Sequence, residues 1–471
     1  MQTDLKKPEP TYRQLSAITA PPGPLMILAG AGTGKTFTIL QRVLRQVTEG
    51  RMRPDQVVIL TYTEKATRDL LRKLRNLDFP EAEDLTVATF HSFCIRIIKE
   101  FNPDILANKT LIGQGDHLFL LARKIDDMNF LSSPVFRSDP LKAIWQSFIP
   151  FFSRARDELY TPEDLRKKIS AMEGIENEET DSFPGVSPKV IPEERQLQLQ
   201  DLVTAYAKYQ EWKEEQGYLD YGDMILNCWK IIRNDTDVVK EVRSRHRHFI
   251  IDEYQDNNYA LNRIIKRIVE ENPSVTVVGD QDQCIYSFRG ANYYTVMDFE
   301  TTYLRKLPER KVTLEENFRS TREILDLANA VISQDQNRVA KRLVSSQGRS
   351  GPRPVWHVAE NSLTPEVVLK LIRQAISAGR SYDELAVLCR TTAKVKEISQ
   401  TLERQGIPVD SFVDYFFGVP AIRDILAWSE VLVEGEYFGP ALGRLLNSVS
   451  EAGMESELEN LRNIRTLEKL S

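Results

Sequence analysis

The sequence of 471 residues has few cysteines and no long apolar run. Four cysteines are scattered along it, and no two form a C-x-x-C pair: Cys94, Cys228, Cys284 and Cys389. This spacing predicts no zinc or iron–sulfur site and fits reduced thiols. No apolar run approaches the roughly 20 residues that span a bilayer, and the polar stretch from Met1 to Pro10 has no signal-peptide pattern. We therefore expect a soluble cytoplasmic protein without a membrane partner.

The chain also lacks a strong charge bias and an internal repeat. Its formal net charge is −6, with 28% charged and 41% hydrophobic residues. That composition excludes a disordered polymer and allows large cores. The length suggests about three domains. The net charge argues neither for nor against nucleic acid, because a basic groove can form on an acidic protein.

A glycine-rich stretch follows the first apolar run, Leu25–Leu28, which is typical of a buried parallel strand. The stretch reads Ala29-Gly30-Ala31-Gly32-Thr33-Gly34-Lys35-Thr36. Glycines let backbone N–H groups close around an anion, and a helix that begins near Lys35 would point its free N–H groups at the same place. Lys35 would face the outer phosphates and Thr36 would ligate Mg²⁺. The alternative is a glycine-rich turn. The strand–loop–helix context favours nucleotide binding, although Ala29 stands where the strict pattern has Gly.

Further apolar runs alternate with helical patterns, which predicts an α/β fold with a doubly wound parallel sheet and its ligand at the carboxyl ends of the strands. The strand candidates are 57–63, 86–90, 249–251 and 275–279. Helical patterns alone fill 106–204, with a capped start at Thr161-Pro162 and an acidic, proline-containing loop over 173–194. A second α/β region begins near Lys311, with strand candidates at 312–314, 354–358 and 385–389 and a helix start at Thr364-Pro365.

Acidic and amide side chains follow two of these strands. Asp252-Glu253-Tyr254-Gln255-Asp256 comes after 249–251, and Asp280 begins a similar stretch after 275–279. Buried carboxylates are costly unless something pairs with them. A structural network would satisfy them, but the end of an apolar strand opposite a phosphate loop favours a site for Mg²⁺ and a water.

These stretches together resemble superfamily 1 DNA helicases of the UvrD/Rep/PcrA type. The resemblance rests on the phosphate loop, Thr-Phe-His-Ser at 89–92, Asp-Glu-Tyr-Gln-Asp at 252–256, Gly-Asp-x-Asp-Gln-x-Ile-Tyr-x-x-Arg-Gly-Ala from 279 and Glu-Asn-Phe-Arg-Ser at 316–320. It implies a P-loop NTPase with a RecA-like parallel sheet in an ATP-binding lobe (1–105 and 205–310). It further implies a helical insertion (106–204), a partial second RecA-like lobe (311–434) and a helical tail (435–471) that would begin a further inserted subdomain.

The resemblance also assigns roles at the ATP site. Gln14 would read adenine, Arg42 would lie near the nucleotide, and Phe318 would stack on the base where the family usually has Tyr. Asp252 would hold Mg²⁺ through water, Glu253 would polarise the attacking water, and Gln255 would sense the γ-phosphate. Arg289 and Arg319 would reach the γ-phosphate region.

On the DNA side, the resemblance assigns a single-strand track. Its residues would be Tyr62, Thr89, Phe90, His91, Tyr286 and Phe288. Aromatic rings suit this role because every base offers a face for stacking. The alternative for each ring taken alone is packing in the core. Tyr62 and Phe288 are the favoured track residues, and Phe288 stands where the family commonly has Trp.

Two family patterns have no counterpart in the sequence: Val-His-x-x-Lys-Gly-Leu-Glu and Tyr-Val-Ala-x-Thr-Arg, the second of which carries an arginine finger. We therefore expect the chain to lack the C-terminal motifs, either because it is a truncated product or because a second polypeptide supplies them. Two functions follow as hypotheses. One is an ATP-dependent 3′-to-5′ DNA helicase acting on single strands in repair, recombination or defence. The other is an incomplete motor that binds ATP and single-stranded DNA but needs a partner chain.

Overall fold

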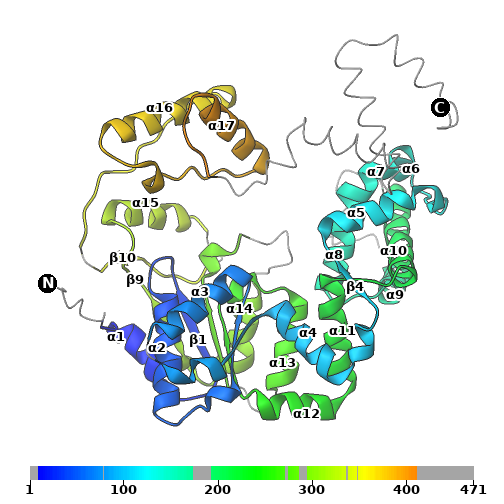
Figure 1. Cartoon of the computed structure of the whole chain (residues 1–471), viewed down its shortest axis with the longest axis horizontal. Coiled ribbons are helices and arrows are strands. Elements are labelled where there is room, and N and C mark those ends of the chain that lie inside the picture. The colour runs from blue at the N-terminus through cyan, green and yellow to red at the C-terminus, as the bar shows by residue number, and fades with distance from the viewer. Residues whose placement is uncertain are drawn as a thin grey trace. The chain divides into compact units, whose positions relative to one another are not determined.

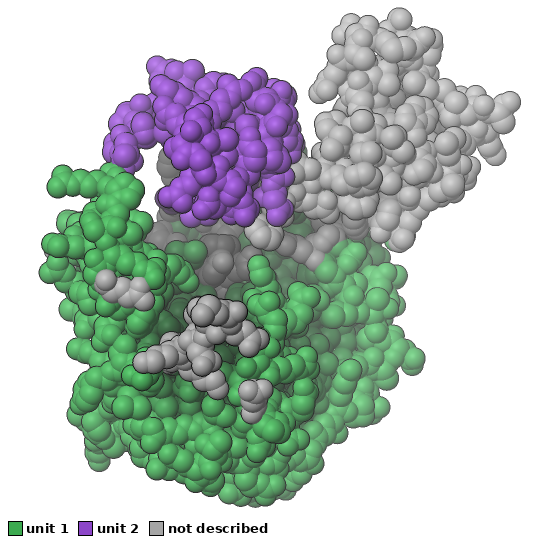
Figure 2. All heavy atoms as spheres, turned by 60° about the vertical axis from the view of Figure 1, so that its left-hand side comes forward, with its two compact units in different colours: residues 1–354 green, residues 355–471 purple. Residues whose placement is uncertain are grey.

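The computed structural model describes residues 9–77, 79–172, 192–270, 274–285, 294–335, 338–346 and 348–410. The chain divides into two compact units, residues 1–354 and residues 355–471, which Figure 2 colours separately. The expected tail at 435–471 and most of the acidic loop at 173–194 lie outside the described residues.

A six-stranded parallel sheet forms the centre of the first unit (Figure 1). Its spatial order is β3-β2-β6-β7-β1-β8, and every described pair in it is parallel. The strands are β1 (Leu25–Ala29), β2 (Val57–Thr61), β3 (Thr86–Thr89), β6 (His248–Ile251), β7 (Val275–Gly279) and β8 (Lys311–Leu314). The predicted α/β class with a parallel sheet is confirmed.

Helices cover both faces of this sheet, which is why its strands are apolar on both sides. On one face, Met26, Val58 and Phe249 pack with α4 (Phe90–Phe101), α11 (Tyr221–Asn234) and α13 (Tyr259–Val269). On the other face, Ile27 and Ile59 pack with α1 (Tyr12–Thr19), α2 (Lys35–Thr48) and α3 (Glu64–Arg75). The carboxyl ends of the central strands thereby lie at one edge of a three-layer arrangement, with the sheet between two layers of helices.

Strand β8 begins at Lys311, where the sequence predicted the start of a second lobe. It pairs with β1, in the register Ile27 to Val312, and so completes the first sheet. Val312 and Leu314 are buried in the same core as β1. After β8 the chain forms β9 (Glu316–Asn317), α15 (Arg322–Ile332) and β10 (Val344–Ser345), where β10 pairs with β9. The first unit therefore extends past the expected boundary.

Between α4 and α11 the chain forms a mainly helical region with a core of its own. Leu121, Phe148, Phe152 and Tyr206 are among its buried residues. Its elements are β4 (Thr110–Ile112), α5 (Gln114–Arg123), α6 (Pro134–Ser138), α7 (Pro140–Ala143), a π-helical turn (Ile144–Phe148), α8 (Ile149–Asp157), α9 (Pro162–Met172), α10 (Pro192–Glu215) and β5 (Tyr218–Asp220). Helix α9 begins at the predicted position, where Pro162 takes the first turn. The domain limits 106 and 204 stay a prediction.

A carboxylate joins this helical region to the helices that pack on the six-stranded sheet. Asp157, the last residue of α8, accepts a 2.7 Å hydrogen bond from Asn258 Nδ2, and Asn258 caps α13. Burial raises the pKa of Asp157 to about 7, against the opposing effect of Arg156, Arg154 and the Asn258 hydrogen bond. Between about pH 4 and pH 7 the folded state holds a proton that the unfolded state has released, so stability falls as the pH rises through this window.

Asp157→Asn is therefore expected to stabilise the protein at pH 8 by roughly 1–4 kcal/mol, because asparagine keeps the acceptor oxygen and carries no charge. The gain should disappear near pH 4. Urea unfolding at both pH values measures it. Asp104→Asn, at an exposed aspartate, is the matched control and should change neither value. An Asp157→Asn variant that is less stable at pH 8 would show that the ionised carboxylate is needed.

The described part of the second unit contains two helices, α16 (Thr364–Ser377) and α17 (Thr392–Arg404), which pack through Ile372, Ile398 and Leu402. The helix predicted at Thr364-Pro365 is confirmed. The strands predicted at 354–358 and 385–389 are not formed in the described residues. Trp356 is 86% exposed and Leu388 is 95% exposed, so these segments lack the neighbours that complete a strand ladder. The partial second lobe stays a prediction.

Candidate functional site

The phosphate loop joins β1 to α2 with two glycines in the left-handed region. Gly32 has φ +73° and Gly34 has φ +82°, conformations that residues with a Cβ seldom adopt. Gly34 is the N-cap of α2, and no side chain caps that helix. Its first N–H groups are therefore left for another acceptor, and the dipole favours an anion there. Ala29 ends β1 fully buried, so the missing first glycine leaves the loop intact.

Lys35 and Glu253 meet across the loop. Lys35 Nζ donates to both carboxylate oxygens of Glu253, at 2.7 and 2.6 Å. Glu253 has φ +49°, a left-handed conformation that strains a residue other than glycine. This backbone conformation places the carboxylate of Glu253 opposite Lys35, at the start of α2. The structure thus brings together the two residues that the sequence assigned to phosphate binding and to water activation.

Asp252 precedes Glu253 at the end of β6. Burial raises the pKa of Asp252 to about 6, and the charge of Glu253 adds to this effect while Lys35 opposes it. The ionised form of Asp252 is therefore destabilised, and a nearby cation would stabilise it. No cluster of three or more His, Cys, Asp or Glu side chains suited to a metal occurs among the described residues. A Mg²⁺ carried by phosphates needs only one or two protein ligands, and Thr36 with Asp252 fits that need.

A hydrogen-bonded relay continues from Glu253 to the next strand. Gln255 Nε2 donates to Glu253 Oε2 at 2.8 Å, and Gln255 Oε1 accepts from the Asp280 backbone N–H at 2.9 Å. Gln255 is buried. Both ends of its amide are held, so Gln255 connects Glu253 to the end of β7. The sequence had placed Gln255 beside the γ-phosphate, and this contact fits that role.

The stretch after β9 lies against the other side of the loop. The Phe318 N–H donates to the Gly32 carbonyl at 2.8 Å, and Asn317 Nδ2 donates to the Ala31 carbonyl at 2.5 Å. A Cβ on Gly32 would meet Arg319 and Asn317 at 2.7 Å. Phe318 and Arg319 are exposed beside the loop. The sequence reasoning assigned no role to Asn317, although the residue lies within the Glu-Asn-Phe-Arg-Ser stretch.

Two predicted nucleotide contacts have other partners in the structure. Arg42 is fully buried and donates to the carbonyls of Ala17 at 2.8 Å and Ala20 at 2.5 Å, so the prediction that it contacts nucleotide is not supported. It holds the end of α1 against α2, and burial lowers its pKa to about 10, aided by Arg310. Gln14 Nε2 donates to the carbonyl of Thr33 at 3.0 Å. Reading of adenine by Gln14 stays a prediction.

The predicted DNA track is only partly described. Phe90 is 3% exposed and belongs to the sheet core, which argues against stacking of its ring on a base, and its place on the track stays a prediction. Thr89 caps α4 and donates to Glu64 at 3.1 Å. His91 packs edge-on against Tyr221, and Tyr62 is half-buried after β2. Tyr286, Phe288 and Arg289 lie outside the described residues.

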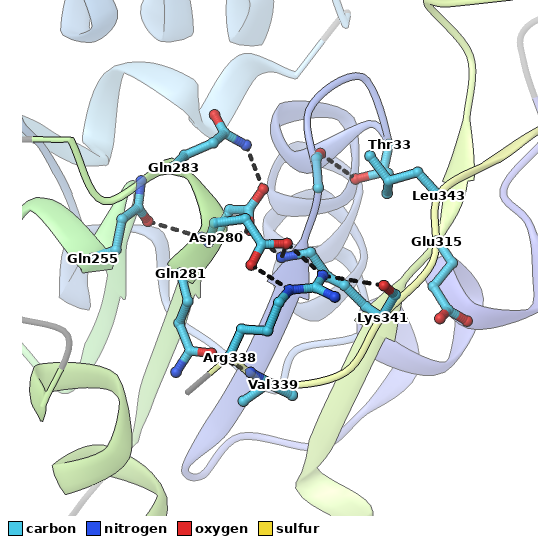
Figure 3. A network of polar contacts seen from close by, with 12 residues as sticks. Thr33, Gln255, Asp280, Gln281, Gln283, Glu315, Arg338, Val339, Lys341 and Leu343 are labelled. Atoms are coloured by element: carbon cyan, nitrogen blue, oxygen red, sulfur yellow. Dashed lines mark hydrogen bonds and ion pairs between the residues drawn. The ribbon is translucent and has the colours of Figure 1, made fainter. Parts of the chain in front are cut away.

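Two basic residues that the sequence reasoning missed also join the site. Arg338 and Lys341 form ion pairs with Asp282 and Asp280, directly after β7 (Figure 3). No spacing signal could have found them, because Lys341 is 61 residues from Asp280. In the part of the chain that the structure describes, no helix has the length and apolar character to cross a membrane.

Comparison with known proteins adds the family. The model of the UvrD/REP helicase N-terminal domain matches residues 11–304, and that of the UvrD-like helicase C-terminal domain matches residues 312–468. The second match does not support the expectation that the chain lacks the C-terminal motifs, nor that a second polypeptide must supply them. Short consensus strings can diverge while the pattern of the whole domain persists.

Several curated relatives are named ATP-dependent DNA helicase PcrA. The protein from Staphylococcus epidermidis is 28% identical over 424 residues, which are 89% of this chain and 53% of the relative. That from Bacillus subtilis is 28% identical over 464 residues, 97% of this chain and 58% of the relative. The chain thus spans somewhat more than half the length of these relatives. With the N-terminal domain model matching more than half of it, the chain belongs to the UvrD/REP helicase family.

Proposed function

We propose that the chain is the motor of an ATP-dependent DNA helicase, which hydrolyses ATP and translocates 3′ to 5′ on single-stranded DNA in DNA repair, recombination or defence. The observation that carries the proposal is the relay Lys35–Glu253–Gln255–Asp280, which links a phosphate loop to a candidate water-activating carboxylate. Family membership and the printed names of the relatives support the DNA substrate. The direction rests on the resemblance of the sequence stretches.

In the proposed hydrolysis, the chain's own groups bind and orient the nucleotide. Backbone N–H groups of the loop and the start of α2 receive the phosphates. Lys35 exchanges its carboxylate partner for the outer phosphates, which frees Glu253 to take a proton from an attacking water. Thr36, together with Asp252 through a water, would hold Mg²⁺, which would supply positive charge near the phosphate oxygens.

Residues on the far side of the loop would complete this arrangement. Arg319 would neutralise charge near the γ-phosphate, and the exposed ring of Phe318 would stack on the base. Gln255 would report the state of the γ-phosphate to Asp280, because its amide bonds to Glu253 at one end and to the Asp280 backbone at the other. In this way the state of the nucleotide would affect the position of the residues that follow β7.

Tyr62 is the proposed stacking residue of the described track, and Tyr62→Ala is expected to weaken binding of single-stranded DNA by about 1–3 kcal/mol with little sequence preference. Fluorescence anisotropy with a labelled oligonucleotide measures the effect. Tyr62→Phe keeps the ring and should bind as the wild type does. Unchanged affinity of the alanine variant together with a large loss of thermal stability would identify Tyr62 as a packing residue.

The proposal as a whole is tested with two partial duplexes, one with a 3′ single-stranded tail and one with a 5′ tail. With ATP and Mg²⁺, strand displacement is expected from the 3′-tailed duplex and not from the 5′-tailed one. Glu253→Gln provides the hydrolysis-deficient control. Displacement from the 5′-tailed duplex alone would overturn the direction, and ATP-independent displacement from either would overturn the motor.

A further inference from the structure

A balanced ion cluster closes the end of β7. Lys341 Nζ contacts Asp280 Oδ1 and lies 2.9 Å from Asp282 Oδ2. Arg338 binds Asp282 with two parallel contacts, Nε to Oδ1 at 2.9 Å and the terminal nitrogen to Oδ2 at 2.6 Å. Figure 3 shows Arg338 and Lys341, which lie on the same chain segment as Val339 and Leu343, approaching the end of β7 where Asp280 lies. Two cations thus pair with two carboxylates. The Arg338–Asp282 pair is bidentate, which fixes the orientation of the guanidinium relative to the carboxylate.

The Lys341–Asp280 pair is buried, and the Arg338–Asp282 pair is partly exposed. The side chain of Lys341 is 4% exposed and that of Asp280 is 3% exposed. Burial alone would raise the pKa of Asp282, but the hydrogen bonds from Arg338 and Lys341 outweigh it and lower that pKa. Removal of one cation would leave an uncompensated carboxylate in a poorly solvated place. The remaining groups would then have to move or take up water.

Asp280 connects this cluster to the candidate water-activating carboxylate. Its side chain binds Lys341, while its backbone N–H donates to Gln255, whose other end donates to Glu253. Gln283 Nε2 and the Asp282 N–H also donate to the Asp280 carboxylate, at 2.5 and 3.1 Å. Two hydrogen bonds and one backbone step therefore separate the Lys341 contact from Glu253.

The same basic segment also contacts the phosphate loop. The side chain of Leu343 lies so close to Gly30 that a Cβ on this glycine would clash with it. The backbone of Leu343 exchanges two hydrogen bonds with the side chain of Asn329 on α15, at 2.9 and 3.1 Å. Val339 N–H donates to Gln281 at 3.3 Å. Residues 338–343 thus contact the phosphate loop, the end of β7 and α15 together.

We propose that Arg338 and Lys341 form a basic clip that positions Gln255 and Glu253 for ATP hydrolysis by fixing Asp280 and Asp282. Both are positioning residues, since they act through the carboxylates and the relay. The proposal rests on the ATP hydrolysis proposed above and adds two residues that none of the family stretches contains. Nucleotide binding itself, which uses the phosphate loop and Lys35, does not depend on the clip.

Lys341→Met, which keeps the length of the side chain and removes its charge, is the main test. The turnover number per nucleotide-binding molecule is expected to fall about ten- to hundredfold, because small displacements of catalytic groups have effects of this size. The dissociation constant for ATP, from calorimetric titration, should stay within about twofold of the wild type. Arg338→Lys, which keeps the charge without the fork, should lose less activity than Arg338→Met.

Lys311→Met is the matched control. Lys311 forms a 2.7 Å ion pair with Glu300 at the amino end of β8, the opposite edge of the sheet from the phosphate loop. This variant should keep the wild-type turnover number. Should both methionine variants lose turnover equally, the effect would be general destabilisation and the clip would be refuted. Turnover of Lys341→Met within about twofold of the wild type would refute it as well.

A second measurement separates the clip from the proposed function. Because the Asp280 N–H donates to Gln255, its hydrogen exchange reports the relay without any hydrolysis. Lys341→Met is expected to speed exchange in the peptide that contains Asp280, while Lys311→Met leaves it unchanged. If the wild type hydrolyses no ATP but exchange still responds to Lys341, the proposed function fails and the positioning stands. If exchange does not respond, the clip is wrong.

Discussion

Glu253→Gln is expected to bind ATP with nearly wild-type affinity and to lose hydrolysis by about 10²–10⁴-fold, because an amide cannot accept the proton of the attacking water. The geometry supports the separation of the two effects. Glu253 lies across the loop from the start of α2, and Lys35 contacts both of its oxygens. Glutamine keeps one of these acceptors, so the loop should keep its shape. Steady-state ATPase assays and calorimetric titration measure the two quantities on the same preparation.

Glu300→Gln is the control for that substitution, since Glu300 pairs with Lys311 away from the phosphate loop. It should retain full turnover. A Glu253→Gln variant that hydrolyses ATP as fast as an active wild type would remove Glu253 from the role of base. The strained φ of +49° would then need another explanation.

Lys35→Ala is expected to weaken ATP binding by roughly ten- to a hundredfold, the effect of losing one hydrogen-bonded charge of about 1.5–3 kcal/mol. The loss should be greater for ATP than for AMP, because the ammonium would face the outer phosphates. Glu253 would also lose its cationic partner, so the negative charge left near the phosphates should add to the effect. Calorimetric titration with ATP and with AMP separates the two nucleotides.

Lys311→Ala serves as the control for that variant, and its affinity for ATP should equal that of the wild type. Lys35→Arg keeps a positive charge and should recover part of the binding. Unchanged affinity of Lys35→Ala for ATP would contradict the assignment of the loop to phosphate binding.

The sequence predicts the sheet well where both strand faces are buried. β1, β2, β6 and β7 are largely apolar runs, and such runs have few alternatives to a buried parallel strand. β8 (Lys311–Leu314) alternates polar with apolar residues, and its membership in the first sheet depends on its pairing with β1, which no local pattern encodes. The segment around Trp356 has a similar pattern and no partner strand in the described residues. Local pattern therefore predicts strand character and leaves strand pairing open.

The candidate site shows the same division. Lys35, Asp252, Glu253 and Gln255 were predictable because short strings fix their places on a loop or a strand end. Arg42 and Phe90 were not, because a motif does not state which face of a helix a side chain takes, and both are buried in packing roles. Arg338 and Lys341 reach Asp282 and Asp280 through tertiary folding alone.

The rate of ATP hydrolysis with and without single-stranded DNA tests the central claim most directly. The wild-type chain with Mg²⁺ is expected to hydrolyse ATP faster when the DNA is present, and Glu253→Gln should show neither basal nor stimulated turnover. In the proposed mechanism, the hydrogen bonds from Glu253 through Gln255 to Asp280 are the route for this coupling. A wild-type rate that does not respond to single-stranded DNA, in a preparation that binds both ATP and DNA, would contradict the account.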